Sequence, residues 1–250
     1  MSVAVQRAEQ LARTHHARYD PSHDFHHVTR VRGLALAIAR SLVAADPSSQ
    51  VDLLVVELAA LAHDFLDQKY TSGPVSTPRE HLDEHLWTGL TDDDVSHDQR
   101  RLVERIVDNV SYSKEVKRIN NGEQTEWHLS CLELHCVQDA DKLDAMGAFG
   151  VMRCAAYSAI TSRPLYLPPS PSTPAPSPPP SSSSPATPTP APARDDSAIA
   201  HFHDKLLRLE AMIKTERGRE LARARTETLR RFVADTEREW GEAAEGLEGR

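Results

Sequence analysis

Histidine and aspartate side chains gather at three separated places in the sequence, and together these two residue types can bind a divalent metal ion. The three places are His27 in HDFHHVTRV, the adjacent pair His63 and Asp64, and the aspartates Asp139, Asp141 and Asp144 in VQDADKLDA. Neutral imidazole nitrogen and carboxylate oxygen form a mixed ligand set that manganese, iron, zinc and nickel accept. The sequence therefore predicts a metal centre built from distant parts of the chain.

The first histidine lies at the start of a predicted helix over residues 25–44. Apolar residues recur there at three- and four-residue steps, at Val31, Leu34, Ala35 and Ile38. His27 precedes Val31 by one helical turn, so the helix that buries Val31 also turns this imidazole inwards. The neighbouring His26 should point elsewhere.

The adjacent histidine and aspartate end the most apolar segment of the chain, VDLLVVELAALAHDF. A helix that is apolar almost all round should run through the middle of the core. Ionisable groups are costly in such a place unless they are paired or coordinated. His63 and Asp64 therefore need a partner, and a divalent cation would supply it.

The remaining ligand should come from a third helix, predicted over residues 125–145. Asp141 follows Val137 by one turn, whereas Asp139 follows Cys136 by about one turn, so both aspartates can face the core. Helical periodicity alone does not choose among Asp139, Asp141 and Asp144.

Helical patterns dominate the rest of the sequence as well. Further helices are predicted over residues 99–109 and 148–159, and Thr77-Pro78-Arg79-Glu80 has the form of a capping box that opens another. Hydrophobic residues make up 39% of the 250-residue chain, which is enough for a sizeable core. We therefore predict an all-α protein with a single helical bundle.

A proline tract interrupts this pattern, because residues 163–192 hold 13 of the 17 prolines. Proline, serine and threonine in such density form neither helix nor central strand and bury little apolar surface. We predict a helical core over 1–163, a disordered Pro/Ser/Thr-rich insertion over 164–197, and a C-terminal helical segment over 198–250 that packs on the same core.

Charge and composition limit the classes of molecule that this protein is expected to bind. The formal net charge of -8 offers no basic surface for a nucleic acid polymer. No segment reaches the roughly 18 uninterrupted apolar residues of a membrane span, and the N-terminus lacks a secretion signal. Three unpaired cysteines fit a reducing compartment. We expect a cytoplasmic protein that acts on a small molecule. Whether it forms a homodimer is left open by the sequence.

The motifs also resemble those of a known family. HDFHHVTRV, LAALAHDFLDQKY and VQDADKLDAMGAFG are similar to the H, HD and D motifs of HD-superfamily phosphohydrolases, above all to small bacterial nucleoside-triphosphate pyrophosphohydrolases. The family's first histidine precedes an x-x-Arg-Val step, which matches His27, and its last aspartate lies in an Ala-Asp-Lys/Arg-Leu context, which matches Asp141. The resemblance implies a single HD-domain bundle with His27, His63, Asp64 and Asp141 as metal ligands.

The likeness covers nearly the whole chain outside the proline tract, since HFHDKLLRLEAMIKTERGRELARAR is similar to the family's C-terminal helix. The sequence departs from the family in the tract itself, in the acidic stretch TDDDVSHDQ, and in Phe65, where an aliphatic residue is usual. None of these departures is a proposed ligand.

The implied activity is hydrolysis of a phosphate ester or anhydride, most simply in a nucleotide, by a nucleoside-triphosphate pyrophosphohydrolase or a nucleotidase. One divalent ion is expected, manganese first, with magnesium, iron, nickel or zinc as alternatives. Such an ion lowers the pKa of water from about 15.7 towards 7 and polarises a phosphoryl oxygen. Asp67 is the candidate to orient or deprotonate the attacking water and Lys69 to neutralise phosphate charge. The candidates for substrate binding are Arg30, Ser111 and Ser113.

Other interpretations stay open at this stage. The protein could be a cyclic-nucleotide phosphodiesterase, a non-catalytic metal or nucleotide sensor, or a plain helical scaffold. His81 and His85 are spaced to chelate a second ion, although solvation explains them more simply. Arg30 could instead pair with an acidic residue, and the basic residues from Lys205 to Arg217 could collect phosphate charge or form a solvated helix face.

Overall fold

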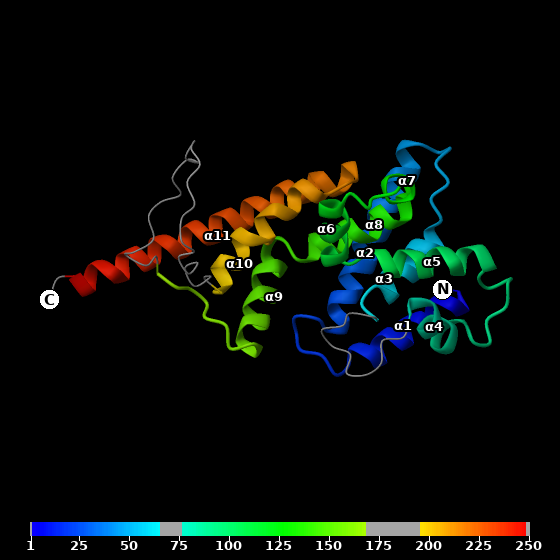
Figure 1. Ribbon diagram of the computed structural model, residues 1–250, viewed down its shortest axis with the longest axis horizontal. Coiled ribbons are helices and arrows are strands. Elements are labelled where there is room, and N and C mark those ends of the chain that lie inside the picture. Colours follow the sequence, from blue (N-terminus) through cyan, green and yellow to red (C-terminus); the bar gives the residue numbers. More distant parts are fainter. Residues whose placement is uncertain (1, 66–76, 169–195, 249–250) are drawn as a thin grey trace, which may run out of the picture.

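The computed structural model describes residues 2–65, 77–168 and 196–248, and these residues are helical with no strand (Figure 1). The helices are α1 (Val3–His16), α2 (Phe25–Ala45), α3 (Leu53–Ala62), α4 (Pro78–Leu82), the π-helix η1 (Asp83–Trp87), α5 (His97–Asn109), α6 (Tyr112–Asn121), α7 (Glu126–Ser130), α8 (Leu132–Asp144), α9 (Gly147–Ile160), α10 (Ala198–Asp204), the 3-10 helix η2 (Leu206–Met212) and α11 (Glu216–Glu248). The all-α prediction is confirmed for this part of the chain.

Helices α2, α3 and α8 form the centre of the bundle. Each packs against the other two, α1 and α5 lie against α3, and α11 crosses α8 and α9. The apolar residues predicted for α2 supply buried core side chains, including Val31, Ala35 and Ile38. Helix α3 is buried almost all round, as its composition predicts, so it carries its C-terminal residues into the interior.

Local capping fixes where these helices begin. The Asp24 carboxylate accepts a hydrogen bond from the backbone N–H of His27, and the Asp52 carboxylate accepts from the N–H groups of Leu54 and Val55. The capping box predicted at Thr77 is present, with Glu80 as its second member. These side chains satisfy N–H groups that have no partner within the helix.

The single helix predicted over 125–145 is wrong, because Cys131 divides it. This residue is extended, with φ of -72° and ψ of 102°, and it ends α7 and begins α8. The break lets α7 leave the axis of α8, and the Nε2 of His135 bonds back to the carbonyl of His128 at 2.9 Å. Helix α6 and the N-terminal helix α1 are additions that the periodicity did not identify.

The chain on the two sides of the proline tract comes together. Backbone N–H groups of Ala198 and Ile199 donate to the carbonyls of Pro164 and Leu165, at 2.8 and 3.2 Å. From this point α10, η2 and α11 continue along the bundle, and Phe202, Leu209 and Leu229 join the buried core. The disorder predicted for the tract concerns residues that lie mostly outside the described ones.

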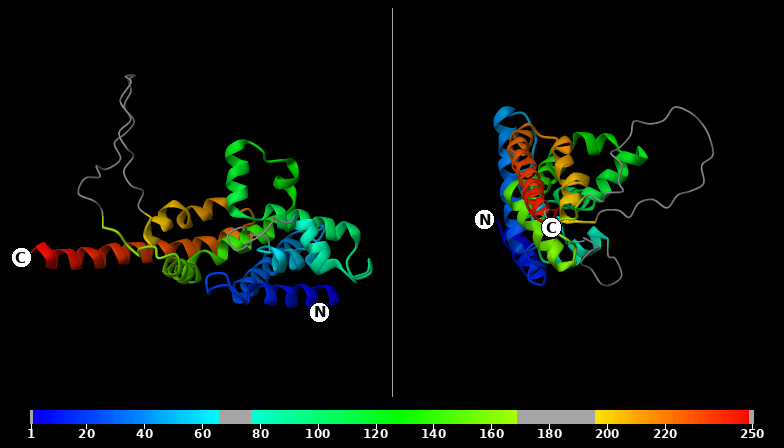
Figure 2. Two further views of the ribbon diagram at one scale, coloured as in Figure 1. Left: turned by 60° about the horizontal axis from the view of Figure 1, so that its bottom comes forward. Right: turned by 90° about the vertical axis from the view of Figure 1, so that its left-hand side faces the viewer.

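Helix α11 is the longest element and extends well beyond the bundle. Its first half lies over α8 and α9, whereas its C-terminal end projects away from the other helices, at the opposite end of the molecule from α1 (Figures 1 and 2). None of the helices in the described ranges is both long enough and apolar enough to cross a membrane. The metal ligands predicted from the sequence lie in α2, directly after α3, and in α8, so the candidate site is at the centre of the bundle.

Candidate metal centre

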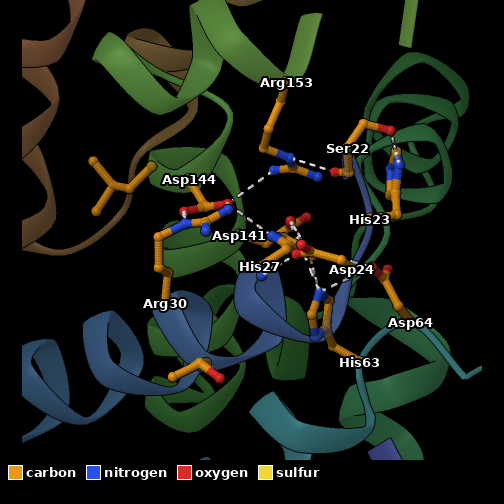
Figure 3. Close-up of polar contacts among 12 residues, drawn as sticks. Ser22, His23, Asp24, His27, Arg30, His63, Asp64, Asp141, Asp144 and Arg153 are labelled. Atoms are coloured by element: carbon orange, nitrogen blue, oxygen red, sulfur yellow. Dashed lines mark hydrogen bonds and ion pairs between the residues drawn. The ribbon is translucent and has the colours of Figure 1, made fainter. Parts of the chain in front are cut away.

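Two buried imidazoles meet where α2 passes the end of α3. The Nε2 atoms of His27 and His63 are 3.2 Å apart, and both side chains are almost completely buried (Figure 3). His26 is exposed, so the helical phase that selected His27 over His26 is the phase observed. Two nitrogens this close in a dry interior need a proton or a cation between them.

Two carboxylates complete the group. Oδ2 of Asp64 lies 3.3 Å from the Nε2 of each histidine, and these three residues place their ligand atoms within 4.8 Å of one another. Oδ1 of Asp141, from α8, lies 3.7 Å from the Nε2 of His27 and 3.9 Å from that of His63. Both carboxylates are partly exposed, so the centre opens to solvent on their side.

Hydrogen bonds on the far side of each ring fix how the imidazoles face the centre. The Nδ1–H of His27 donates to Oδ2 of Asp144, and that of His63 donates to the carbonyl of Ala60, both at 2.8 Å. Because Asp144 and the carbonyl can only accept, each ring keeps its proton on Nδ1 and can turn the lone pair of Nε2 inwards. This is the arrangement that orients histidines in metal sites.

The electrostatics of the group favour positive charge at its centre. Burial opposes ionisation of Asp64, yet His63 and His27 hold the pKa of its carboxyl well below the ordinary range. Burial alone would lower the pKa of His63, but the carboxylates of Asp64 and Asp141 raise it to about 9. A cation at this point is therefore stabilised by its surroundings.

A buried carboxylate of α8 connects the centre to two arginines. Arg30 donates from Nε to Oδ1 of Asp144 at 2.6 Å and from a terminal nitrogen to Oδ2 at 3.0 Å, and Arg153 of α9 donates to Oδ2 at 3.1 Å. Burial opposes the charge, but the hydrogen bonds from His27 and Arg30 lower the pKa of Asp144. The acidic partner suggested for Arg30 is thus Asp144, while its proposed contact with substrate stays a prediction.

Asp139 has a different environment from Asp141 despite lying on the same helix. Its carboxylate accepts hydrogen bonds from the backbone N–H groups of Lys214 and Thr215 and from the Thr215 hydroxyl, at 2.7 to 3.0 Å. It therefore anchors the start of α11 to α8. The structure brings Asp141, and not Asp139, to the two histidines.

The centre forms part of the wall of a cavity of about 310 Å³, called here the first cavity. Its lining residues are His23, His63, Asp64, Val107, Val110, Ser111, Tyr112, Ser113, Lys114, Asp141, Lys142, Ala145, Arg153, Lys205 and Leu209. Ser111 and Ser113 thus share a cavity with the predicted ligands. Asp67 and Lys69 lie outside the described residues.

The second ion suggested for His81 and His85 has less support. Their rings are 4.5 Å apart, at the junction of α4 and η1. In the described ranges, the histidine, cysteine and carboxylate side chains that bring three ligand atoms within 4.8 Å of one another are His27, His63 and Asp64.

Several residues of the site carry no signal in the sequence that singles them out. His23 and Arg153 line the first cavity, and the buried Glu115 of α6 forms a 2.7 Å ion pair with Lys142. Arg153 comes from a helix with no motif of its own. Lys142 and Asp144 did have a signal, because both lie in the same motif as Asp141.

The residues present fit a divalent cation. Ligand atoms that each lie about 2.1 Å from a shared ion are about 3.0 to 4.2 Å apart, depending on the angle between them. The nitrogen–nitrogen and nitrogen–oxygen separations here run from 3.2 to 3.9 Å. Two imidazoles and two carboxylates also match the ligand chemistry of manganese, iron, zinc and nickel.

Comparison with known proteins agrees with this geometry. The HD domain family model matches residues 24–146, which include all four predicted ligands. YpgQ of Bacillus subtilis is 30% identical over 217 residues, which are 87% of this chain and 84% of YpgQ. The crystal structure of YpgQ in complex with ADP has a TM-score of 0.64 at 25% identity, over 94% of this chain and 97% of that one.

Two further crystal structures share the fold. A protein from Lactobacillus plantarum has a TM-score of 0.68 at 26% identity, and the match covers 97% of this chain and 99% of the other. An HD-superfamily hydrolase from Bacillus thuringiensis has a TM-score of 0.61 over 95% of this chain and 96% of the other, at 22% identity, and this likeness concerns the fold alone. From the family model and the YpgQ sequence together, the chain belongs to the HD domain family.

Proposed function

We propose that this protein is a metal-dependent phosphohydrolase that cleaves a phosphate ester or anhydride of a nucleotide, as a nucleoside-triphosphate pyrophosphohydrolase or a nucleotidase. The observation that carries the proposal is the group of His27, His63, Asp64 and Asp141, the last three of which line a cavity that also presents cationic side chains. Carboxylates that can bind a metal ion lie beside cationic side chains that can bind a phosphate, and this combination suits a phosphate bound at a metal site.

The four residues would hold a divalent ion, manganese first. Such an ion would act as a Lewis acid towards a phosphoryl oxygen and a water molecule. The contribution of Asp144 is to keep the Nδ1 proton on His27, so that Nε2 stays available as a ligand. Ala60 does the same for His63 through its backbone carbonyl.

The cationic side chains would neutralise and orient the phosphate. Arg153 is held by Asp144 and by the carbonyl of Ser22, at 3.1 and 2.7 Å, so its guanidinium is preorganised. Lys205 and Lys114 line the same cavity, where Ser111 and Ser113 would offer hydroxyl hydrogen bonds. Asp67 and Lys69 stay proposals for orienting the water and for stabilising charge on the phosphate.

Two observations support a nucleotide as the substrate. The relative YpgQ has been crystallised in complex with ADP. In the present protein, the first cavity joins apolar side chains, Val107, Val110 and Leu209, with the ring of Tyr112. An apolar wall next to a charged one fits a molecule that has both a base and a phosphate chain.

The test is turnover of a nucleotide panel with manganese, magnesium, iron, nickel or zinc added separately. The panel should contain nucleoside triphosphates, monophosphates and cyclic monophosphates, with pyrophosphate and orthophosphate measured as products. His63→Ala should abolish turnover and lower the metal content found by elemental analysis. His26→Ala is the matched control, because this exposed histidine adjoins His27, and it should leave both unchanged.

The outcomes separate the alternatives. Release of pyrophosphate or orthophosphate supports the proposal, and turnover of cyclic monophosphates alone would identify a phosphodiesterase instead. Tight nucleotide binding with no product from any member of the panel would identify a sensor. A wild-type protein that takes up no divalent ion would contradict the metal centre itself.

A further inference from the structure

The long helix α11 carries opposite net charges in its two halves. Residues 216–231 hold six arginines and three glutamates, a net charge of +3, whereas residues 232–248 hold one arginine and six carboxylates, a net charge of -5. Acidic residues stabilise the N-terminal end of a helix and basic residues its C-terminal end, because of the helix dipole. In α11 this order is reversed, and its last turn contains no basic residue. The charge pattern is therefore unfavourable for the helix on its own.

The C-terminal end of α11 also lies outside the bundle. Val233 is the last buried residue of the described part of α11, and the helix then continues to Glu248 (Figures 1 and 2). This end includes Gly241 and Gly246, and each glycine in a helix costs about 1 kcal/mol relative to alanine. An isolated helix of about 15 residues is marginal in water even when it consists of good helix formers. The end of α11 therefore needs a surface to pack against.

One exposed face of α11 runs across the point at which the helix leaves the bundle. Residues that follow one another at three- or four-residue steps lie on the same side of a helix. The set, called here the α11 stripe, is exposed or partly exposed and consists of Arg223, Glu227, Arg230, Ala234, Glu237, Gly241 and Glu245. A Cβ added at Gly241 would meet nothing within 4 Å, so the space over the stripe is open there. On a different side of α11, by contrast, the ring of Trp240 contacts that of Tyr166.

The charges of the α11 stripe have weak partners or none within the chain. Neither Arg223 nor Glu245 forms an ion pair or a side-chain hydrogen bond with another described residue. Arg230 lies 3.6 Å from a carboxylate oxygen of Glu210 and 3.9 Å from one of Glu227, and these side chains are 30% to 74% exposed. Ion pairs between exposed groups contribute little. The stripe can therefore exchange these contacts for contacts with another molecule.

The arginine end of the stripe also borders a surface cavity. This cavity, of about 530 Å³, lies between η2 and α11 and shares no lining residue with the first cavity. Its lining residues are Leu207, Glu210, Ala211, Ile213, Arg219, Arg223 and Arg230. A surface that combines apolar and cationic side chains suits a helix that carries carboxylates. The second half of α11 is such a helix, so a second copy of the chain has the required chemistry.

We propose that two copies of this protein pair through the α11 stripe, with the two helices antiparallel and crossing at Ala234. Residues equally far before and after Ala234 then lie opposite each other. Arg223 of one copy faces Glu245 of the other, and Arg230 of one copy lies close to Glu237 of the other. Each contact occurs twice, because a two-fold axis passes through the crossing. Ala234 and Gly241 are small, which lets the two helix axes approach closely.

The position of the crossing keeps the two bundles apart. Each bundle buries its own α11 only as far as Val233, so the bundles lie on opposite sides of the two-fold axis. Residues 235–248 of each copy rise about 21 Å, at about 1.5 Å per residue, and extend along the first half of α11 of the other copy. The negative half of one helix thus meets the positive half of the other. A charge order that is unfavourable in one helix becomes favourable in the antiparallel pair.

The experiment measures the Kd of self-association by sedimentation equilibrium on the full chain. The wild type should form a dimer at low salt, and added salt should weaken the dimer because it screens exposed charges. Arg223→Glu and Glu245→Arg should each raise the Kd about 10- to 100-fold, because each reversal replaces two attractive contacts with two repulsive ones. Circular dichroism on each variant checks that its helix content equals that of the wild type.

An equimolar mixture of the two variants tests the antiparallel pairing itself. In a mixed dimer the reversed charge of each variant faces the reversed charge of the other, and the natural Arg223 of one copy faces the natural Glu245 of the other. The mixture should therefore dimerise with a Kd within about threefold of the wild type. The double variant, with both reversals in one chain, should do the same. A mixture that associates as weakly as the single variants would overturn the proposal.

Glu239→Arg is the matched control. It makes the same change of charge as Glu245→Arg in the same helix, but this exposed residue lies on the side of α11 away from the stripe. Its Kd should equal that of the wild type. Equal weakening by Glu239→Arg and Glu245→Arg would overturn the proposal, because net charge alone would then explain the effect. A wild type that stays monomeric at low salt, or a dimer that no reversal weakens, would overturn it as well.

Discussion

Nδ1 of His27 donates a hydrogen bond of 2.8 Å to Oδ2 of Asp144, and this contact joins residues that are 117 positions apart in the sequence. Asp144 also accepts hydrogen bonds from Arg30 and Arg153, so one buried carboxylate ties α2, α8 and α9 together behind the metal centre. The orientation of the imidazole thus depends on a residue that is not itself a proposed ligand.

Replacing this carboxylate should weaken metal binding without removing a ligand. Asp144→Asn keeps the shape of the side chain but loses the charge that holds His27 and both arginines. Metal affinity should fall about 10- to 100-fold, the usual effect of losing such an orienting partner. Competition against a fluorescent chelator measures the Kd. An affinity equal to that of the wild type would show that Asp144 does not orient His27.

The two aspartates of α8 should give opposite results. Asp141→Asn should remove most of the metal affinity and change the stability of the metal-free protein little, because this side chain is partly exposed. Asp139→Asn should lower the free energy of unfolding by about 2 kcal/mol, because the hydrogen bonds from three donors lose their charged acceptor. The metal stoichiometry of this variant should stay the same. Urea unfolding and elemental analysis on both variants test this, and loss of metal in Asp139→Asn alone would reverse the assignment.

Acidification should destabilise the protein through Glu115. This buried carboxylate forms ion pairs with Lys142 and Lys214. Burial opposes its charge, but the two lysines lower the pKa of Glu115 below its ordinary value of 4.5. A carboxyl whose pKa is lower in the folded state stabilises the fold above the unfolded pKa, and this stability is lost as the pH falls through the folded pKa.

The measurement compares wild type and Glu115→Gln by urea unfolding at pH 7 and at pH 3. At pH 7 the variant should be less stable by about 3 kcal/mol, because the buried Lys142 and the partly buried Lys214 lose their counter-charge. At pH 3 the difference should shrink. The double variant Glu115→Gln with Lys142→Met is the control and should recover part of the loss. A difference that is constant between the two pH values would contradict the role of Glu115.

Two glycine-to-alanine substitutions should change stability in opposite directions. A Cβ at Gly150, in α9, would lie 2.3 Å from the carbonyl oxygen of Ala145, so Gly150→Ala should cost about 2 kcal/mol by forcing a backbone shift. A Cβ at Gly33, on the exposed face of α2, meets nothing within 4 Å. Gly33→Ala should stabilise the helix by about 0.5 to 1 kcal/mol. Thermal unfolding of both variants measures the two changes in stability. A stabilised Gly150→Ala would contradict the prediction.

The sequence determined the helical class and much of the centre by itself. The apolar steps along residues 25–44 select His27 over His26, because one face of α2 packs on the core and the other meets solvent. The apolar composition of α3 places His63 and Asp64 at the end of a buried helix. In both cases a local pattern, and the cost of burying an ionisable group, carry the inference.

Helical periodicity did not choose between Asp139 and Asp141; the family resemblance favoured Asp141, and only the tertiary structure shows the physical difference between them. Nearly every residue of α8 is buried, because α2, α3 and α11 surround it. Helical periodicity identifies an inward face only where the opposite face is in water, so on α8 it leaves every aspartate a candidate. The backbone N–H groups of Lys214 and Thr215 engage Asp139, the side chains of His27 and Arg30 engage Asp144, and Asp141 is left facing the histidines. These partners come from distant parts of the chain, so no local pattern could identify them.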